Sequence, residues 1–388
     1  MLNYKNQSRP LRIGIDGRMY RSEVAGISRY SQNLVKNLLA IDEKNQYILF
    51  MTPDDRKEFQ KLSIKNSELN NLKIVIVNIP HYSIAEQTKF AKIIDKENLD
   101  LMHFLNFNYP VNYKGKFITT IHDLTLIFFP ETAKKTNLMK KLAFRYVMKK
   151  SCQNAIKIIT DSENTKQDII KYLKISNTKI VVTYLAADDK MFSRRSKTIV
   201  NHLKQKYQIE ISLIITVGQF RPHKNLPGLL QAFSILREKI DCKLVIVGTP
   251  DHTYEQFWQI LKKSKYKKDI IITGFVSDEE LAGWYQLATV YVFPSFYEGF
   301  GLPGLEAMQA GLPVIASKAS SLPEIYNDAA IYFNPLKTEE MAAKIKMVIE
   351  DKNLRAKLIA KGRAIAQFYS WRKTALETLK TYKEVIQE

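Results

Sequence analysis

The sequence predicts an α/β protein with two doubly wound parallel sheets, and three observations support this fold class. Short buried strands alternate with helical segments along the whole chain, which is typical of parallel sheets with helices on both faces. The length of 388 residues exceeds one ordinary domain and suits two domains of fewer than about 200 residues each. The hydrophobic fraction of 45% and the charged fraction of 25% are typical of a globular chain. Two such domains imply a cleft.

Aliphatic runs mark the strands of both halves. In the first half we expect strands at 11–15, 47–51, 72–77, 101–104, 117–121 and 156–160, a short last strand inside 181–197, and a helix at 30–39. In the second half we expect strands at 212–217, 243–247, 270–273, 290–293, 314–316 and 331–333, with helices at 226–238 and 339–350. The linker falls near 181–197. The predicted divisions are an N-terminal domain at 1–195, a C-terminal domain at 196–366, and a C-terminal segment at 367–388.

The two cysteines, Cys152 and Cys242, lie far apart and lack a CxxC spacing. The sequence therefore contains neither a disulfide framework nor a zinc site. Residues 1–10 are polar and lack the apolar core of a signal peptide, and no run of about 18 apolar residues occurs. We expect a cytoplasmic protein that neither is exported through a signal peptide nor spans a membrane.

The formal net charge is +20, and positive residues are dense at 133–150. There, basic side chains surround apolar ones at helical spacing, which predicts a basic amphipathic helix. This helix either contacts an anionic membrane surface, at the inner membrane face, or is an ordinary solvated helix that packs on the core. For the whole chain, the charge is compatible with a solvated basic surface, a phosphorylated substrate, anionic lipid or nucleic acid.

Three glycines and a proline crowd the loop that follows the predicted strand 290–293. Gly299 and Gly301 permit backbone angles that other residues avoid, and they let amide N–H groups approach a ligand. Pro303 suits the first turn of a helix, and Gly311 suits its C-terminal cap. A helix that begins after a glycine loop is a site for an anion such as pyrophosphate.

Two carboxylates, Glu298 and Glu306, bracket this anion site. Glu298 precedes the loop, and Glu306 lies about one turn into the predicted helix. Both can accept hydrogen bonds from hydroxyl groups, and a nucleotide sugar carries such groups on its hexose and on its ribose, with pyrophosphate between them. The alternative is that Glu298 is a surface loop residue and that Glu306 is an ordinary first-turn acid.

A second loop, at 217–226, holds two cations, Arg221 and Lys224. When a sugar leaves a nucleoside diphosphate, the negative charge that develops must be stabilised by a metal or by cationic side chains. The sequence contains no Asp-x-Asp metal motif, so we expect Arg221 and Lys224 to supply the charge without a metal. The alternative is a solvated turn.

In the first half, His122 follows the predicted strand 117–121. Doubly wound sheets bind ligands beyond the carboxyl ends of their strands, so His122 is a candidate for the cleft. A single histidine is more often structural. Asp123 is expected either to orient His122 or to cap the following turn.

Glu298 and Glu306, with seven residues between them, resemble the EX7E signature of the family-4 retaining glycosyltransferases. The neighbouring segments 293–295, 299–303 and 310–314 are also similar to that family. The resemblance implies the GT-B fold, in which two Rossmann-like domains face a central cleft. It also implies a hexosyltransferase that retains the configuration of the anomeric carbon and requires no cofactor besides its nucleotide-sugar donor.

The resemblance also implies roles for individual residues. The first glutamate and the loop amides after it hold the donor sugar, the second glutamate holds the ribose, and the lysine faces the departing phosphate. The implied catalytic residues are His122, Arg221, Lys224 and Glu298. The implied donor-binding residues are Gly26, Arg221, Lys224, Val276, Glu298, Gly299, Phe300, Gly301, Leu302 and Glu306.

Other segments match the family in the same way. The histidine contacts the departing phosphate and the transferred sugar, and Gly26 belongs, with Asp16 to Arg18, to loops before the first long helix. Val276 lies in the segment 272–281, which resembles the loop around the nucleotide base. The segment 368–371 resembles the element before a C-terminal helix that returns to the first domain.

The chain looks most similar to bacterial mannosyltransferases of cell-surface polysaccharide assembly, which favours GDP-mannose as donor and a glycan or lipid-linked hydroxyl as acceptor. A UDP-sugar is the alternative donor. From other classes, a basic nucleic-acid-binding protein would show interleaved aromatic and basic residues on one face or a known binding module, and neither is present. An inactive nucleotide-sugar-binding scaffold conflicts with the intact glutamates and cations.

Overall fold

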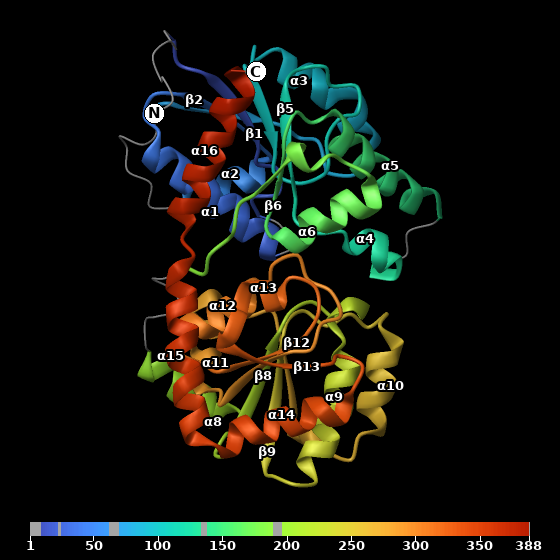
Figure 1. Cartoon of the computed structure of the whole chain (residues 1–388), viewed down its shortest axis with the longest axis vertical. Coiled ribbons are helices and arrows are strands. Elements are labelled where there is room, and N and C mark those ends of the chain that lie inside the picture. The colour runs from blue at the N-terminus through green and yellow to red at the C-terminus, as the bar shows by residue number, and fades with distance from the viewer. Residues whose placement is uncertain (1–8, 22–24, 62–69, 133–137, 189–195, 388) are drawn as a thin grey trace. The chain divides into compact units, whose positions relative to one another are not determined.

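Seven parallel strands form the sheet of the first unit in the computed structural model (Figure 1). Their order across the sheet is β3-β2-β1-β4-β5-β6-β7. The strands are β1 (Arg12–Asp16), β2 (Gln46–Met51), β3 (Leu72–Ile76), β4 (Leu101–Phe104), β5 (Phe117–Ile121), β6 (Ile158–Thr160) and β7 (Ile180–Val182). The structure describes residues 9–21, 25–61, 70–132, 138–188 and 196–387. Every residue of β4 and β5 is buried, as expected for a parallel sheet covered on both faces.

Six parallel strands form the second sheet, in the order β10-β9-β8-β11-β12-β13. They are β8 (Ser212–Val217), β9 (Cys242–Val247), β10 (Ile270–Gly274), β11 (Val290–Phe293), β12 (Val314–Ser317) and β13 (Ala330–Phe333). In both sheets the direction of winding reverses once, between β1 and β4 in the first and between β8 and β11 in the second. These two points are where doubly wound sheets bind their ligands. The predicted α/β fold with two doubly wound sheets is confirmed.

Helices connect the strands in both units. The helices at 25–188 and at the C-terminus are α1 (Ala25–Ile41), α2 (Pro53–Gln60), α3 (Ala91–Asp95), α4 (Thr125–Phe128), α5 (Leu138–Asn154), α6 (Glu163–Asp168) and α16 (Trp371–Gln387). The remainder are α8 (Lys197–Lys206), α9 (Leu226–Arg237), α10 (Glu255–Lys263), α11 (Asp278–Leu287), α12 (Leu302–Gln309), α13 (Leu322–Tyr326), α14 (Thr338–Glu350) and α15 (Lys352–Phe368). Within the described ranges, no helix is both long and apolar enough to cross a membrane.

Helix α1 starts earlier than the sequence predicts. The prediction places a helix at 30–39, whereas α1 begins at Ala25 and includes Gly26 in its first turn. Glycine destabilises a helix by about 1 kcal/mol relative to alanine. The local sequence pattern therefore places the start of this helix too late in the chain. Contacts with α16 inside the same unit stabilise the helix beyond its propensity.

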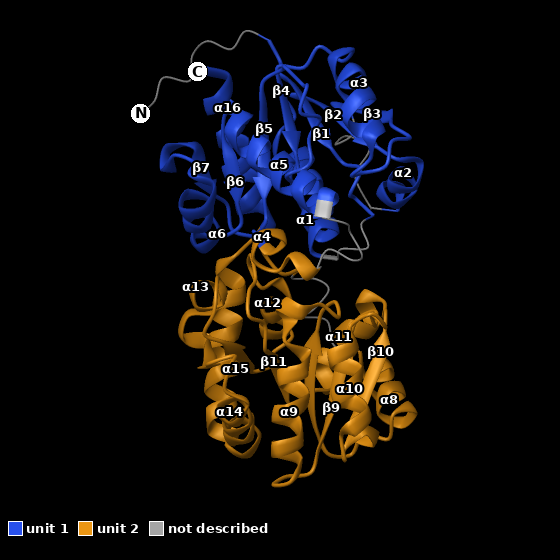
Figure 2. Cartoon of the chain, turned by 90° about the vertical axis from the view of Figure 1, so that its right-hand side faces the viewer, with its two compact units in different colours: residues 1–124, 135–185, 371–388 blue, residues 125–134, 186–370 orange. Residues whose placement is uncertain are grey.

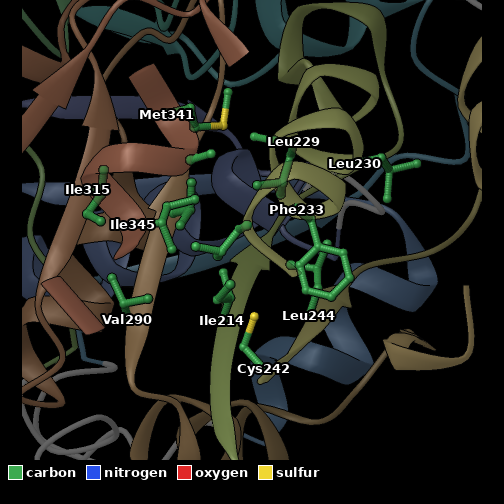
Figure 3. Close-up of a cluster of buried hydrophobic side chains, with 14 of the residues drawn as sticks. Ile214, Leu229, Leu230, Phe233, Cys242, Leu244, Val290, Ile315, Met341 and Ile345 are labelled. Atoms are coloured by element: carbon green, nitrogen blue, oxygen red, sulfur yellow. The ribbon is translucent and has the colours of Figure 1, made fainter. Parts of the chain in front are cut away.

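The core of the second unit lies between its sheet and the helices α9 and α14 (Figure 3). Leu229 and Phe233 of α9 pack with Met341 and Ile345 of α14, all of them fully buried. Leu and Ile side chains of this kind each contribute about 1.5–3 kcal/mol when they are removed from water. This core holds the strand ends of the second sheet in place, and with them the loops that carry the candidate site.

The chain divides into two compact units (Figure 2). Unit 1 contains residues 1–124, 135–185 and 371–388, and unit 2 contains residues 125–134 and 186–370. The sequence places the main boundary after residue 195, whereas the two units divide between residues 185 and 186. The segment 189–195 lies outside the described residues. The sequence places the C-terminal segment at 367–388, whereas α15 runs to Phe368 and α16 starts at Trp371.

The segment 125–134 belongs to unit 2 although its neighbours in the chain belong to unit 1. Its aromatic rings explain the assignment. Phe128 meets Tyr297 edge-on, with ring centroids 5.0 Å apart, and Phe129 stacks on Phe296 at 6.4 Å. The sequence does not predict that residues 125–134 belong to unit 2, because only the folded chain brings these aromatic rings together.

Candidate active site

Two loops of unit 2 meet at the point where the winding of the sheet reverses. The loop after β8 carries Arg221 and the short 3₁₀ helix η6 (Pro222–Lys224), and the loop after β11 carries Glu298. Because β8 and β11 are neighbouring parallel strands, both loops leave the same edge of the sheet. The sequence-predicted cations and the first glutamate are therefore placed at the expected ligand-binding edge.

Lys224 and Glu298 form a charged pair. Nζ of Lys224 donates to both carboxylate oxygens of Glu298, at 2.7 and 2.9 Å. Only 19% of the lysine side chain and 11% of the glutamate side chain are exposed. Such charge-assisted bonds are stronger than neutral ones and are less screened by solvent when they are this buried. The contact and the burial of this pair contradict the two alternative interpretations, a solvated turn for Lys224 and a surface loop position for Glu298.

Asn225 connects the two loops through hydrogen bonds, and it is not among the residues predicted from the sequence. It adopts a left-handed backbone conformation with φ of 51°, and its Nδ2 donates to the carbonyls of Pro294 and Pro335, each at 3.0 Å. Its Oδ1 accepts from the N–H of Gly228 at 3.3 Å and caps α9. The signal was present in the sequence, because an asparagine before Leu-Pro is typical of a helix N-cap.

Arg221 points to a different partner than Lys224 does. Its Nη1 lies 3.3 Å from Oδ2 of Asp251, which is half-buried in the loop after β9. Burial lowers the pKa of Arg221, and the charge of Asp251 offsets part of that effect. The structure thus brings Lys224 and Glu298 into contact but pairs Arg221 with a residue that the sequence did not single out.

The backbone has the predicted form at Gly301, Pro303 and Gly311, whereas Gly299 is not among the glycines with a positive φ. Gly301 has φ of 99°, a left-handed conformation that favours glycine, and α12 begins at Leu302 with Pro303 in its first turn. Gly311 has φ of 82° just after the helix ends. Glu306 is buried and accepts a hydrogen bond from the Tyr285 hydroxyl at 3.1 Å. Its burial contradicts the alternative of an ordinary first-turn acid.

The segment that resembles a base-binding loop lies at the end of β10. Gly274 has φ of 75°, and the ring of Phe275 is 85% exposed. Val276 is half-buried, and Ser277 caps α11 by accepting from the N–H of Glu280 at 3.2 Å. β10 and β9 are neighbours and run parallel with β8, so this loop leaves the sheet edge that carries Lys224.

In unit 1, His122 follows β5 and has an acidic partner. Its Nδ1 lies 2.7 Å from Oδ2 of Asp161, and its Nε2 lies 3.0 Å from the carbonyl oxygen of Leu105. The ring also meets Tyr30 edge-on at 4.8 Å. Of the two roles that the sequence predicts for Asp123, orienting His122 belongs to Asp161 instead. Asp161 directly follows β6, which pairs with β5, and this position was the signal for it.

Both ring nitrogens of His122 lie within hydrogen-bonding distance of an oxygen atom, an arrangement that the doubly protonated ring satisfies on both sides. Burial alone would lower the pKa of His122, but the charge and hydrogen bond of Asp161 and the Leu105 carbonyl outweigh it and raise that pKa. The raised pKa stabilises the fold below the unfolded value of 6.5, and this stabilisation is lost as the pH rises through the folded-state pKa.

The loop after β1 is braced by a buried ion cluster. Nη2 of Arg18 bonds Asp16 at 2.7 Å and Glu86 at 2.8 Å, and its guanidinium lies 3.7 Å from the centroid of the Phe90 ring. Arg18 therefore has a structural role in this loop. Gly26 is exposed in α1, and a Cβ at this position would meet no described atom within 4 Å besides its chain neighbours and the backbone of its own helix. Residues 22–24 lie outside the described ranges.

Among the residues that the structure describes, no group of three or more His, Cys, Asp or Glu side chains has an arrangement that could hold a metal ion. The polar groups gathered at the edge of the second sheet are instead a lysine, an arginine, two glutamates and a glycine loop at a helix N-terminus. This set suits a ligand that combines an anion with hydroxyl groups.

Comparison with known proteins assigns both halves of the chain. A family model described as glycosyl transferases group 1 matches residues 201–365, and one described as glycosyltransferase family 4 matches residues 24–190. The O-antigen chain mannosyltransferase B of Escherichia coli is 30% identical over 374 residues, which span 93% of this chain and 96% of that protein.

Solved structures share the fold. A glycosyltransferase from Rickettsia africae ESF-5 superposes with a TM-score of 0.74 at 20% identity, covering 98% of this chain and all of that one. Anabaena Alr3699/HepE, solved in complex with UDP and glucose, superposes with a TM-score of 0.76 at 16% identity, covering 96% of this chain and all of that one. Together with the site geometry, these matches show that the chain belongs to the family-4 (group 1) glycosyltransferases of the GT-B fold.

Proposed function

We propose that this glycosyltransferase moves a mannosyl residue from GDP-mannose to a hydroxyl of a glycan or lipid-linked acceptor, with retention at the anomeric carbon and without a metal. The observation that carries the proposal is the buried Lys224–Glu298 pair at the ligand-binding edge of unit 2. The sugar is inferred from the mannosyltransferase of Escherichia coli that is similar over almost the whole chain.

The residues of unit 2 suit the two ends of such a donor. Lys224 and Arg221 supply positive charge where the diphosphate becomes more negative as its bond to the anomeric carbon breaks. Glu298 accepts hydrogen bonds from sugar hydroxyls, and Glu306 accepts them from the ribose. In the proposed step the acceptor oxygen bonds to the anomeric carbon on the face that the diphosphate leaves, and the acceptor proton passes to a diphosphate oxygen.

A UDP-sugar is the alternative donor. The solved Anabaena structure holds UDP and glucose, so the fold accommodates that nucleotide in at least one protein. The side chains of the 274–276 loop do not decide between bases, because backbone groups there can bond to either base edge. A binding experiment decides.

Thermal-shift measurements with GDP-mannose, UDP-glucose, UDP-N-acetylglucosamine, GDP and UDP test the donor. We expect GDP and GDP-mannose to raise Tm by several degrees, because a ligand at about 100 times its Kd contributes about 2.7 kcal/mol to the free energy of unfolding. A shift with the uridine ligands alone would replace GDP-mannose by a UDP-sugar. If no nucleotide shifts Tm, the donor site itself is wrongly assigned.

We further propose that α5 contacts an anionic membrane surface. Met139, Leu142 and Tyr146 are 77%, 55% and 55% exposed, and their spacing places them along one side of the helix. Basic residues flank them: Lys140, Lys141, Arg145, Lys149 and Lys150. Exposed apolar side chains among positive charges are typical of helices that lie in the interface of anionic bilayers. Residues 133–137 of the predicted basic helix lie outside the described ranges.

Co-sedimentation with vesicles tests this contact. We expect the chain to bind vesicles with about one third phosphatidylglycerol, and the double variant Leu142→Ser/Tyr146→Ser to bind roughly tenfold more weakly, since each buried CH₂ contributes about 0.8 kcal/mol. Leu336→Ser removes an even more exposed leucine from unit 2 and should bind as the wild type does. Equal binding of all three proteins would show that α5 is an ordinary solvated helix.

A further inference from the structure

Backbone carbonyls of the donor loop are held by hydroxyl groups from one later segment of the chain. Ser320 and Ser321 both donate to the carbonyl of Glu298, at 2.6 and 3.0 Å. The Tyr326 hydroxyl donates to the carbonyl of Gly301. All three side chains lie in residues 317–326, which run from the end of β12 to the end of α13 and which we call the hydroxyl segment. β12 is the neighbour of β11 in the sheet.

A third carbonyl of the same loop shows in which direction the N–H groups of these peptides point. Ser317 donates to the carbonyl of Ser295 at 2.5 Å. The N–H of the same peptide, on Phe296, donates to the carbonyl of His223 at 2.8 Å. His223 precedes Lys224 in η6, so this peptide has its carbonyl toward the hydroxyl segment and its N–H toward the lysine loop.

The same geometry applies to the two peptides further along. In a trans peptide the C=O of one residue and the N–H of the next point in opposite directions, and no described peptide bond is cis. The bonds to the carbonyls of Glu298 and Gly301 therefore turn the N–H groups of Gly299 and Leu302 away from the hydroxyl segment. Leu302 is the first residue of α12, where amide groups favour an anion.

Tyr326 reaches the loop because two glycines leave room for it. Its ring is fully buried. A Cβ added at Gly301 would come within 2.5 Å of the Tyr326 hydroxyl oxygen, and one added at Gly304 would come closer still. Glycine at these two positions thus serves a close approach of side chain to backbone as well as the left-handed angle at Gly301.

We propose that Ser320, Ser321 and Tyr326 are positioning residues, which hold the N–H groups of Gly299 and Leu302 toward the diphosphate of the donor. The inference rests on the proposed function of this loop and adds the residues that set its backbone orientation. An amide that is already oriented needs no reorganisation when the anion binds, and this is how backbone donors gain their strength in a site.

Tyr326→Phe tests the inference, because it keeps the ring and removes only the hydroxyl. The affinities to measure are those for the nucleoside diphosphate that the wild type prefers and for its monophosphate. We expect the Kd of the diphosphate to rise about tenfold, the effect of one hydrogen bond to a charged group, and the Kd of the monophosphate to change much less. The double variant Ser320→Ala/Ser321→Ala removes the hydrogen bonds to the carbonyl of Glu298. We expect it, too, to raise the Kd of the diphosphate much more than the Kd of the monophosphate.

Tyr332→Phe is the matched control. Tyr332 lies in β13, and its hydroxyl donates to the carbonyl of Asn327 at 2.6 Å, which is a bond of the same kind outside the donor loop. We expect no change in either Kd for this variant. A merely structural role of Tyr326 would lower Tm and weaken both nucleotides equally.

The outcomes separate the inference from the function on which it rests. If the wild type binds a nucleoside diphosphate and both loop variants keep its preference over the monophosphate, the positioning role is wrong and the proposed function stands. If the wild type binds none, the proposed function itself fails. Should Tyr326→Phe not fold, the serine variant decides alone.

Discussion

Lys224→Met should lower kcat/KM for sugar transfer by about 10²–10³-fold, the loss that follows when one group aimed at a developing charge is removed. Lys224 is the cation that the structure holds against Glu298, and its charge is only slightly exposed. Its removal takes away the stabilisation of the leaving diphosphate. It also leaves the Glu298 carboxylate without that partner, in a place where an unpaired charge is costly.

A matched lysine makes the result specific. Lys243 in β9 also donates two hydrogen bonds, but to the backbone oxygens of Tyr207 and Gln208 at 3.0 and 2.9 Å. It lies at the start of its strand, away from the ligand-binding edge. Lys243→Met should keep kcat/KM within about twofold, since substitutions outside the site change little. A fall of equal size in both variants, or none in Lys224→Met, would remove Lys224 from the chemistry.

The pair can also be dissected by a double-mutant cycle. Glu298→Gln alone should reduce transfer strongly, because the glutamine can no longer accept from the lysine and from a sugar hydroxyl as a carboxylate does. We expect Lys224→Met/Glu298→Gln to lose much less than the sum of the two single losses, because residues in direct contact couple. Additive losses would show that the two side chains act independently on the donor.

Asp161→Asn should move the alkaline limb of the kcat/KM profile to lower pH. In the folded chain Asp161 holds the pKa of His122 above its ordinary value, whereas burial opposes it. Asparagine removes the charge and leaves the burial, so the pKa of His122 falls. If the imidazolium is the active form, activity above that pKa drops about tenfold for each unit by which the pKa falls. The profile of kcat/KM reports the pKa values of the free enzyme.

Asp123→Asn is the graded control for this profile. Asp123 also raises the pKa of His122, but it is the smallest of the contributions and supplies no hydrogen bond among them. We expect a smaller displacement in the same direction. A profile that falls uniformly at every pH in Asp161→Asn, with no displacement, would mean that Asp161 orients the ring without controlling its charge.

Much of the fold could be predicted because its signals are local. Buried runs such as 101–104 and 117–121 are strands in the structure with the same bounds, since parallel strands covered on both faces consist almost wholly of apolar residues. The glycine loop and Pro303 predict α12 for an equally local reason, the backbone angles that glycine permits and proline imposes. The start of α1 escaped prediction because Gly26 lowers the local propensity that tertiary contacts restore.

The candidate site, like the fold, has one part that the sequence predicts and another that only the folded chain shows. By itself the sequence determined two doubly wound sheets and the loops that carry Lys224, Glu298 and His122, because residues close in the chain set strands, turns and helix starts. Only the tertiary structure decided which side chains meet: Lys224 with Glu298 across 74 residues, and His122 with Asp161 across 39. Such pairs depend on the order of strands in the sheet and on burial, which lowers the screening of each charge, and no local pattern encodes either one.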